Sequence, residues 1–210
     1  MAALEDVLTV YQRPFDPAHP VICMDETSKQ LVGETRLALP GEPGQVQRED
    51  YEYERRGVAN LFLFSEPLTG WREVQVTERR TRLDWAVALC ELSDRHYPAA
   101  ERITVVLDNL NTHGPASFYE AFAPEKARRL AERFEFHYTP KHGSWLNMAE
   151  IELSVLARDL PERVGERAAL EKHVAAWQVR RNQQGVTADW QFTTAKARIK
   201  LRKLYPTVEN

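Results

Sequence analysis

Three acidic residues could carry chemistry because of where they stand in the sequence. Asp25 closes the apolar run VICMD and Asp108 closes RITVVLD, and both runs are typical of buried strands. Ligands of open α/β sheets bind at the carboxyl ends of strands. Glu150 opens the helix predicted within HYTPKHGSWLNMAEIELSVLARDL. If the three carboxylates converge, their oxygens suit Mg²⁺, and two such ions about 4 Å apart can activate a water or a 3′-hydroxyl for phosphoryl transfer.

Each of these residues also has a structural interpretation. Asp25 and Asp108 could cap a turn or the next helix, and Asn147 with Glu150 fits a capping box in which Asn147 is the N-cap. Glu152 competes with Glu150, since the two lie on opposite flanks of the apolar stripe of the helix, at similar distances from it. The occurrence of all three carboxylates in this order favours chemistry, but periodicity leaves the choice between Glu150 and Glu152 open.

The elements that would position these residues alternate between strand-like and helix-like segments. Strands are predicted at 21–25, 58–67, 71–78, 102–108 and 134–138, the second and third as a hairpin. Helices are predicted at 3–11, 82–97, 116–122, 125–133, 145–159, 166–181 and 194–204, and 37–57 is predicted as a loop with an extended arm. Helices between buried strands indicate an α/β fold with a mixed five-stranded sheet, flanked by helices and parallel in part.

The composition is that of an ordinary globular domain and excludes several classes of protein. With a formal net charge of −3, binding to DNA must come from local basic patches. The two cysteines, Cys23 and Cys90, form no CxxC pair, which excludes a zinc ribbon and a disulfide framework and favours a reducing cytoplasm. We find no signal peptide, no apolar run of about 18 residues that could span a membrane, and no phosphate-binding glycine loop of an NTPase.

Three long motifs resemble the catalytic domain of IS630-type bacterial transposases, relatives of the Tc1/mariner group. They are CMDETSKQLVGETR, VVLDNLNTHGPASFYEAF and TPKHGSWLNMAEIELSVLARDL. The resemblance covers nearly the whole chain from about Tyr11. It implies an RNase H-like fold in which Asp25, Asp108 and Glu150 form a DDE triad that binds Mg²⁺ or Mn²⁺, as two ions. The segment between the last two motifs is longer than in the mariner branch, which leaves the alignment within 114–133 open.

The same resemblance implies a DNA transposase that cleaves and transfers DNA strands. Its partners would be transposon ends and a TA target, it would assemble as a homodimer on DNA, and it would be cytoplasmic and nucleoid-associated in a bacterium. Transposases of this family carry an N-terminal helix-turn-helix region, which we expect to be missing here. We predict a linker-like remnant helix at 1–16, the catalytic domain at 17–185 and a basic C-terminal helix at 186–210.

Polar residues near the carboxylates are expected to support them: Asn109, His113 and Asn147. His113 would orient a phosphate or a carboxylate, with a plain loop histidine as the alternative. Glu26 is left out of the triad because it points to the opposite face of the strand from Asp25. Trp145 could stack on an unpaired base, although a buried or half-buried core position is favoured.

Basic residues predict weak contacts with the DNA backbone, with a solvated surface as the alternative. They are Arg55, Arg56, Lys141, His142, Lys196, Lys200 and Lys203. Two other functions compete with the transposase: a non-catalytic remnant that dimerises with or regulates an intact transposase, and another RNase H-like nuclease such as a junction resolvase. Mn²⁺ binding at the triad and a preference for branched DNA would distinguish them.

Overall fold

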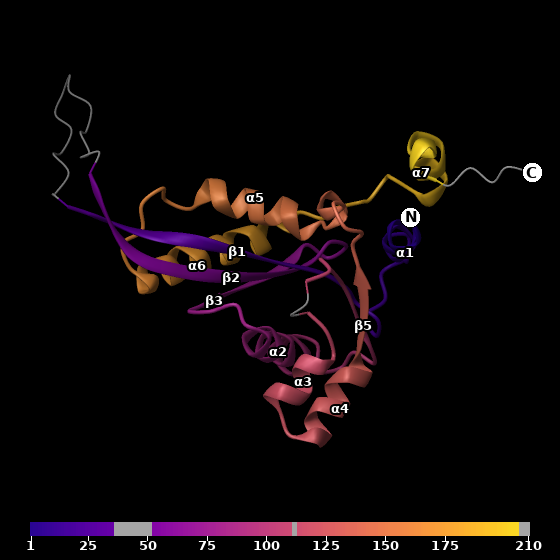
Figure 1. The fold of residues 1–210 in the computed structure, drawn as a ribbon, viewed down its shortest axis with the longest axis horizontal. Helices are drawn as coiled ribbons and strands as arrows, with labels where there is room; N and C mark the ends of the chain where they lie inside the picture. Colours follow the sequence, from indigo (N-terminus) through magenta and orange to yellow (C-terminus); the bar gives the residue numbers. More distant parts are fainter. Residues whose placement is uncertain (36–51, 111–112, 206–210) are drawn as a thin grey trace, which may run out of the picture.

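The computed structural model describes residues 1–35, 52–110 and 113–205, and its centre is a five-stranded sheet in the order β3-β2-β1-β4-β5 (Figure 1). The strands are β1 (Val21–Glu34), β2 (Tyr53–Glu66), β3 (Trp71–Thr77), β4 (Ile103–Leu107) and β5 (Phe134–Tyr138). β1, β2 and β3 are antiparallel neighbours, whereas β4 runs parallel to β1 and β5 parallel to β4. The mixed five-stranded α/β fold predicted from the sequence is confirmed.

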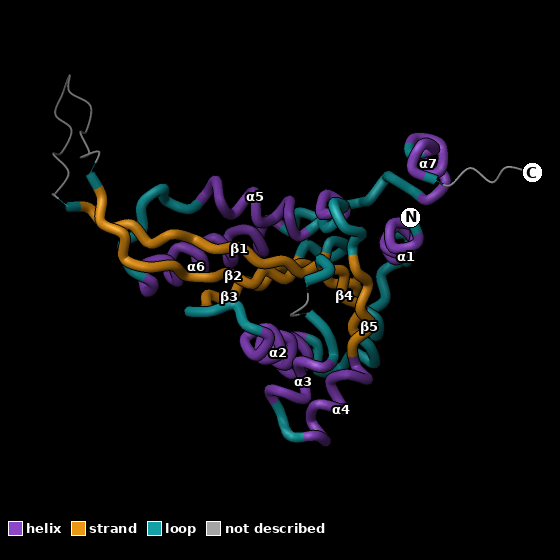
Figure 2. The backbone as a smooth tube through the Cα atoms, viewed as in Figure 1, coloured by secondary structure: helices purple, strands orange, loops and turns teal. Residues whose placement is uncertain are grey.

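Helices cover both faces of the sheet (Figures 1 and 2). They are α1 (Ala2–Val10), α2 (Arg82–Glu91), α3 (Ala116–Ala121), α4 (Pro124–Arg133), α5 (Ala149–Asp159), α6 (Arg167–Gln184) and α7 (Thr194–Lys200). α5 and α6 lie on one face and α2, α3 and α4 on the other. Among the residues described, none of these helices is both long and apolar enough to cross a membrane.

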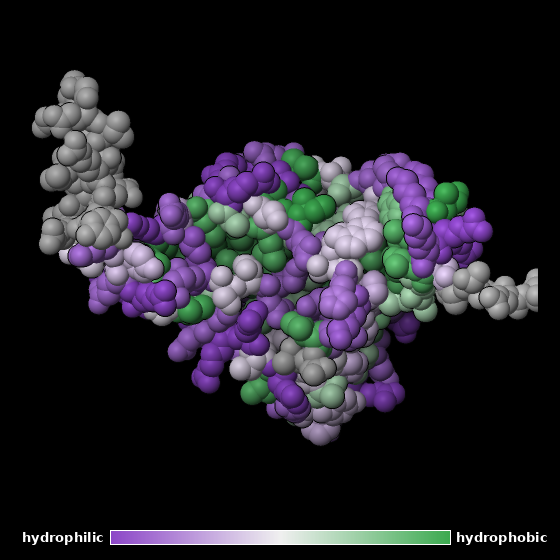
Figure 3. All heavy atoms as spheres, turned by 45° about the horizontal axis from the view of Figure 1, so that its top comes forward, coloured by the Kyte–Doolittle hydropathy of each residue, from purple (hydrophilic) through white to green (hydrophobic). Residues whose placement is uncertain are grey.

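Alternation along the strands builds a separate core on each face. Ile22 and Met24 of β1 pack in the cluster under α2, while Cys23 between them packs in the cluster under α5. Successive side chains of a strand point to opposite faces, so a fully apolar run serves two cores at once. The face that Figure 3 shows carries hydrophilic residues with hydrophobic patches between them. The buried residues of the two clusters show that the helices turn apolar sides to the sheet.

β1 and β2 are longer than the strands predicted at 21–25 and 58–67. β1 continues to Glu34 and β2 begins at Tyr53, with these two residues facing each other in the antiparallel ladder. The prediction of a loop is therefore wrong for 53–57. Residue 52 is described without regular structure, and 37–51 lies outside the described residues. Backbone pairing needs no apolar side chains, so the charged and exposed residues of this segment hid the strand.

The ends of the described chain pack on each other beside β5 (Figure 1). α1 buries Leu4, Val7, Leu8 and Val10 in the core under α5. α7 lies against it through Arg198, whose guanidinium contacts the Glu5 carboxylate at 2.8 and 2.7 Å. The division of the chain at residues 16 and 185 stays a prediction. The buried residues of α1 belong to the core of the domain, whereas a linker would be largely exposed.

Candidate active site

Asp25 and Asp108 lie next to each other at one end of the sheet. The parallel pairing of β1 with β4 aligns Cys23 with Val106, and the same register carries Asp25 onto Asp108. Because neighbouring strands lie about 4.8 Å apart, the two residues lie side by side where the pairing of β1 with β4 ends. Asp25 accepts a hydrogen bond from the backbone N–H of Glu26 at 2.8 Å. Asp108 directly follows β4, as predicted. The prediction that a strand ends at Asp25 is wrong, because β1 continues to Glu34 through its antiparallel pairing with β2 after its pairing with β4 has ended.

The start of α5 is tied directly to the end of β1. The side-chain amide of Asn147 donates to the carbonyl of Met24 at 2.9 Å, and its oxygen accepts from the backbone N–H of Ala149 at 3.1 Å. Because Met24 precedes Asp25, this bridge brings the first turn of the helix, which contains Glu150, close to Asp25. The predicted capping box is wrong: α5 begins at Ala149 with Met148 as its N-cap, which puts Glu150 one position too early to close the box.

A second anchor for this turn comes from α1. The hydroxyl of Tyr11, directly after the helix, donates to the carbonyl of Leu146 at 2.7 Å and lies 3.4 Å from the backbone nitrogen of Met148. Tyr11 is buried beside Cys23 of β1, which raises the pKa of its phenol well above the ordinary value and keeps it a donor. The N-terminal segment therefore helps to fix the loop that presents Glu150.

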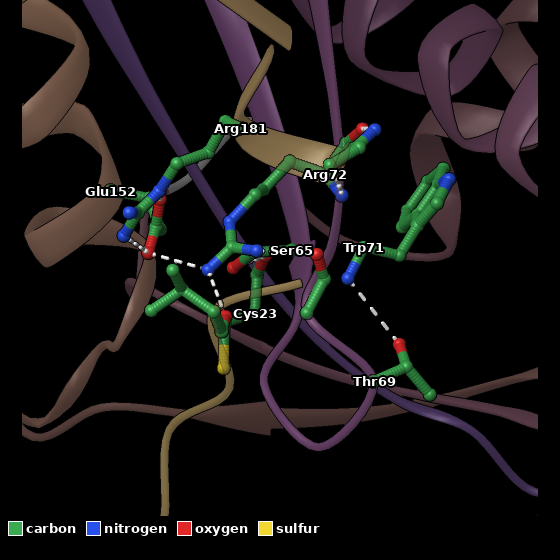
Figure 4. A network of polar contacts seen from close by, with 10 residues as sticks. Cys23, Ser65, Thr69, Trp71, Arg72, Glu152 and Arg181 are labelled. Carbon is green, nitrogen blue, oxygen red and sulfur yellow. Dashed lines mark hydrogen bonds and ion pairs between the residues drawn. The ribbon is translucent and has the colours of Figure 1, made fainter. Parts of the chain in front are cut away.

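The two glutamates of α5 that the sequence could not separate have different surroundings. Glu152 is held between two arginines: Arg72 at 2.8 Å, and Arg181 at 2.9 and 3.0 Å (Figure 4). Burial alone would raise the pKa of Glu152, but the bonds to Arg181 and Arg72 outweigh it and hold that pKa below its ordinary value. The carboxylate of Glu150 has no hydrogen bond or ion pair within the described chain. Of the two glutamates, Glu150 is the one whose carboxylate has no partner among the described residues.

The acidic residues around Asp25 affect its ionisation. Burial, together with the charges of Asp108, Glu26 and Glu150, raises the pKa of Asp25 to about 7 against the opposing bond from the Glu26 N–H. Like charges gathered without a cation disfavour ionisation. Among the described residues, Asp25, Asp108 and Glu150 do not form a set of ligand atoms within 4.8 Å of one another. A set made only of carboxylate oxygens fits Mg²⁺ or Mn²⁺.

The tightest group of metal-ligand atoms lies beside the predicted triad. Within the described ranges, Glu26, Asp108 and His113 bring their ligand atoms within 4.8 Å of one another. His113 Nδ1 is 3.1 Å from Asp108 Oδ1, and Nε2 is 3.0 Å from Glu26 Oε2. Burial would lower the pKa of His113, but Asp108 and Glu26 outweigh it and raise that pKa to about 9. The predicted contact of His113 with a carboxylate is present; the role of Glu26 was missed.

A cavity of about 390 Å³ opens next to Asp108. Its lining includes Asn109, Lys141 and His142, and both basic side chains are exposed. His142 has a positive φ of 65°, which non-glycine residues rarely adopt outside functional or tightly constrained turns. Two of the predicted basic residues and one predicted supporting residue therefore lie beside an acidic residue of the triad.

The other predicted basic residues lie away from this cavity. Arg55 and Arg56 belong to the exposed outer part of β2, where Arg56 contacts Glu54 at 3.2 Å. Lys196 donates to the carbonyl of Gln191 at 2.7 Å, and Lys200 and Lys203 are exposed near the C-terminal end of the described chain. Trp145 is 48% exposed and packs its ring on Phe192, with centroids 5.9 Å apart. These residues make no common surface with Asp108.

Solved structures with the same fold are transposase complexes. The chain resembles the mariner Mos1 paired end complex with Mg (TM-score 0.62, 16% identity, 99% of this chain and 62% of that chain). It also resembles a pre-cleavage Mos1 transpososome (0.60, 15%, 99% and 62%) and the Mos1 paired-end complex with left transposon end (0.58, 16%, 88% and 56%). The chain thus spans less than two thirds of the length of these transposases, and the likeness confirms the predicted RNase H-like fold.

One of the two sequence comparisons identifies a family. No curated protein matches the chain. The family of DDE superfamily endonucleases matches residues 20–171, which include Asp25, Asp108 and Glu150. With most of its length inside that match, this chain belongs to the DDE superfamily endonucleases.

Proposed function

We propose that this chain is the catalytic domain of a DDE transposase that cleaves and transfers DNA strands with divalent metal ions. The observation that carries the proposal is that Asp25 lies beside Asp108 and near enough to Glu150 for both charges to raise its pKa, while the Glu150 carboxylate has no partner among the described residues. Glu152, the rival on the same helix, is neutralised by two arginines. Membership of the endonuclease family makes phosphoryl transfer the matching chemistry.

The three carboxylates are the residues that would hold Mg²⁺ or Mn²⁺. Two ions bound there would activate the attacking oxygen and stabilise the leaving oxygen. Asp25 and Asp108 sit on neighbouring strands and so form a rigid base, while Glu150 enters from a helix whose start is fixed to β1 by Asn147. Glu150 is therefore the member whose side chain can change rotamer as charge is neutralised.

DNA would approach along the cavity beside Asp108. Lys141 and His142 on its rim would contact backbone phosphates, and Asn109 would hydrogen-bond a phosphate or sugar. The more distant basic residues Arg55, Arg56, Lys196, Lys200 and Lys203 would add weak backbone contacts. With a net charge of −3, we expect weak and strongly salt-dependent binding with a dissociation constant of about 10⁻⁴–10⁻⁶ M.

The identity of the DNA is a further part of the proposal. The Mos1 structures hold transposon-end DNA, and their fold is shared by this chain. By extension we infer transposon ends as the substrate, a TA dinucleotide as the target, and a homodimer assembled on DNA in a bacterial cytoplasm, near the nucleoid. The motifs of the sequence favour an IS630-type element within the Tc1/mariner group.

The test is metal-dependent strand cleavage and joining on transposon-end duplexes, compared with Asp25→Asn and Asp108→Asn. We expect activity with Mg²⁺ or Mn²⁺ and its loss in both variants, with Glu135→Gln on β5 as a control. Full activity in either aspartate variant would contradict the triad. A folded protein that binds no Mn²⁺ at Asp25 would instead be the non-catalytic module, and a preference for branched DNA would indicate a junction resolvase.

A further inference from the structure

His113 links two acidic residues that the sheet would otherwise keep apart. Glu26 shares the face of β1 on which Met24 packs under α2, whereas Asp25 beside it points to the opposite face. The imidazole reaches Glu26 with one nitrogen, at 3.0 Å, and Asp108 with the other, at 3.1 Å. The imidazole of His113 thus connects Glu26, whose side chain is buried, to Asp108 in the candidate active site.

The ring of His113 has little freedom to move. It stacks on Trp85 with centroids 5.5 Å apart and an interplanar angle of 14°, and only 2% of its side chain is exposed. Trp85 in turn stacks on Phe118, which helps to hold the indole against the imidazole of His113. The hydroxyl of Tyr138, at the end of β5, donates to the carbonyl of His113 at 2.9 Å. Packing and backbone contacts both fix where the imidazole points.

The arrangement uses one oxygen of Asp108 and spares the other. Oδ1 lies against His113, while Oδ2 has no partner within the part of the chain that the structure describes. The Asp108 side chain is 31% exposed, compared with 5% for Glu26. Glu26 Oε2 is buried and makes no hydrogen bond of regular geometry in the described chain, so its ion pair with His113 Nε2 at 3.0 Å is the contact that offsets its burial.

We propose that Glu26 and His113 are a positioning pair that fixes the Asp108 carboxylate with Oδ2 turned toward the metal site. The inference rests on the proposed function, because it assigns Asp108 as a metal ligand. Partners that hydrogen-bond a metal ligand fix its orientation, and their loss typically costs about 10–100-fold in metal affinity or activity. Glu26 acts through His113 and touches neither the ions nor DNA.

The experiment measures Mn²⁺ affinity of the metal-free protein by calorimetry, with no DNA present. Glu26→Gln keeps the shape of the side chain and removes its charge, and we expect affinity to fall by about tenfold. His113→Asn should have a similar effect, and the double variant should lose no more than the larger single loss, since both act through one contact. In strand cleavage, kcat should fall while KM for DNA stays unchanged.

The chain offers a matched control. Glu135 contacts His137 at 2.8 Å on β5, which is also a glutamate–histidine pair but one without contact to Asp108. Glu135→Gln should leave Mn²⁺ affinity unchanged. If Glu26→Gln is folded and binds Mn²⁺ as tightly as the unaltered protein, the positioning pair is overturned. If Glu26→Gln does not fold, Glu26→Asp keeps the charge while shortening the reach, and unchanged affinity in that variant overturns the proposal equally.

A third variant separates this inference from the proposed function. Asp25→Asn should abolish tight Mn²⁺ binding if the triad holds the ions. If Asp25→Asn binds normally, the proposed function fails. If, in addition, Glu26→Gln then loses binding, the ion sits directly on Glu26, Asp108 and His113, and the positioning role fails as well. Loss in Asp25→Asn together with normal binding in Glu26→Gln rejects the positioning pair alone.

Discussion

Glu150 and Glu152 stand two residues apart in the first turns of α5, yet they lie in opposite environments. Glu152 is enclosed by Arg72 and Arg181, and the three side chains join β3, α5 and α6 (Figure 4). Glu150 lies near Asp25 and Asp108 and has no cation among the described residues. A buried carboxylate paired with permanent cations cannot lose them without a large cost in stability, whereas acidic residues gathered without cations are typical of functional sites.

The pKa shifts of the two regions express the same difference. Burial penalises the charged form in both places. At Glu152 the arginines overcome that penalty and lower the pKa, whereas at Asp25 the neighbouring acids add to it and the pKa rises to about 7. One region of the sheet is therefore complete without a ligand. Under the proposed function, the other gains its cations when metal ions bind.

The largest effect should come from Glu150→Gln. Loss of one metal ligand removes several kcal/mol of transition-state stabilisation, so strand cleavage should fall by about a thousandfold. Thermal stability of the metal-free protein should stay the same or rise slightly, because one repelling charge is gone. Cleavage kinetics and a thermal melt of the same sample check both parts. Near-normal cleavage would remove Glu150 from the triad.

Glu152→Gln should show the opposite pattern. Removal of one partner from a buried ion network leaves Arg72 and Arg181 uncompensated, which typically costs about 3 kcal/mol or more of unfolding free energy. Urea denaturation measures this loss. Mn²⁺ affinity of the fraction that remains folded should be unchanged. An unaltered unfolding midpoint would mean that the network does not stabilise the fold, and a lost Mn²⁺ site would move the active site toward Glu152.

The contrast also shows which features a sequence can reveal. The place of Asp108 directly after β4 was predictable, because the local pattern of a buried strand shows where that strand ends. The end of β1 was not, because its later part is held by pairing with β2 and is less apolar. The choice between Glu150 and Glu152 was not, because it depends on Arg72 and Arg181, and neither distance along the chain nor helical periodicity connects them to α5. The sheet and its helices came from periodicity, which is a local signal.

The missed features are those in which tertiary contacts replace local ones. Asn147 has the residue type of an N-cap, but its amide bonds the carbonyl of Met24 in another element. Glu26 was correctly placed on the opposite face from Asp25. Strand alternation could not show that His113, from a loop after β4, reaches around to join it to Asp108. The signal that could have found it is the spacing of His113 five residues after Asp108, in DNLNTH.

Acidity should affect the two regions in opposite directions. The folded-state pKa of Asp25, about 7, lies above its ordinary value of 3.8, so its protonation stabilises the metal-free fold fully below about pH 4, and this contribution is lost as the pH rises through 7. The pKa of Glu152 is lowered, so its contribution is lost as the pH falls below its ordinary 4.5. Unfolding free energies of the unaltered protein, Asp25→Asn and Glu152→Gln across pH 4–8 test both signs.

Metal binding should follow the same titration at Asp25. Mn²⁺ must displace the proton, so its affinity should fall by about tenfold per pH unit below pH 7 when one proton is released. Calorimetry at several pH values, in buffers of different ionisation enthalpy, gives both the affinity and the protons released. An affinity that is flat from neutral to mildly acidic pH would show that Asp25 is not a ligand.

The smallest expected effect is a difference in Mn²⁺ affinity between variants of two asparagines, each of which connects two elements in one of the two regions. Asn147 ties the start of α5 to β1, and Asn182 of α6 bonds the backbone N–H and carbonyl of Arg72, both at 2.8 Å. Replacement by alanine leaves buried backbone groups unsatisfied, so each variant should lose about 1–3 kcal/mol of unfolding free energy. Only Asn147→Ala should also weaken Mn²⁺ binding, by a few-fold, because it loosens the turn that presents Glu150 while leaving the ligands in place. Equal Mn²⁺ affinities in the two variants, measured on samples shown to be folded, would mean that the position of Glu150 is set by α5 packing alone and that the bridge to β1 serves only stability.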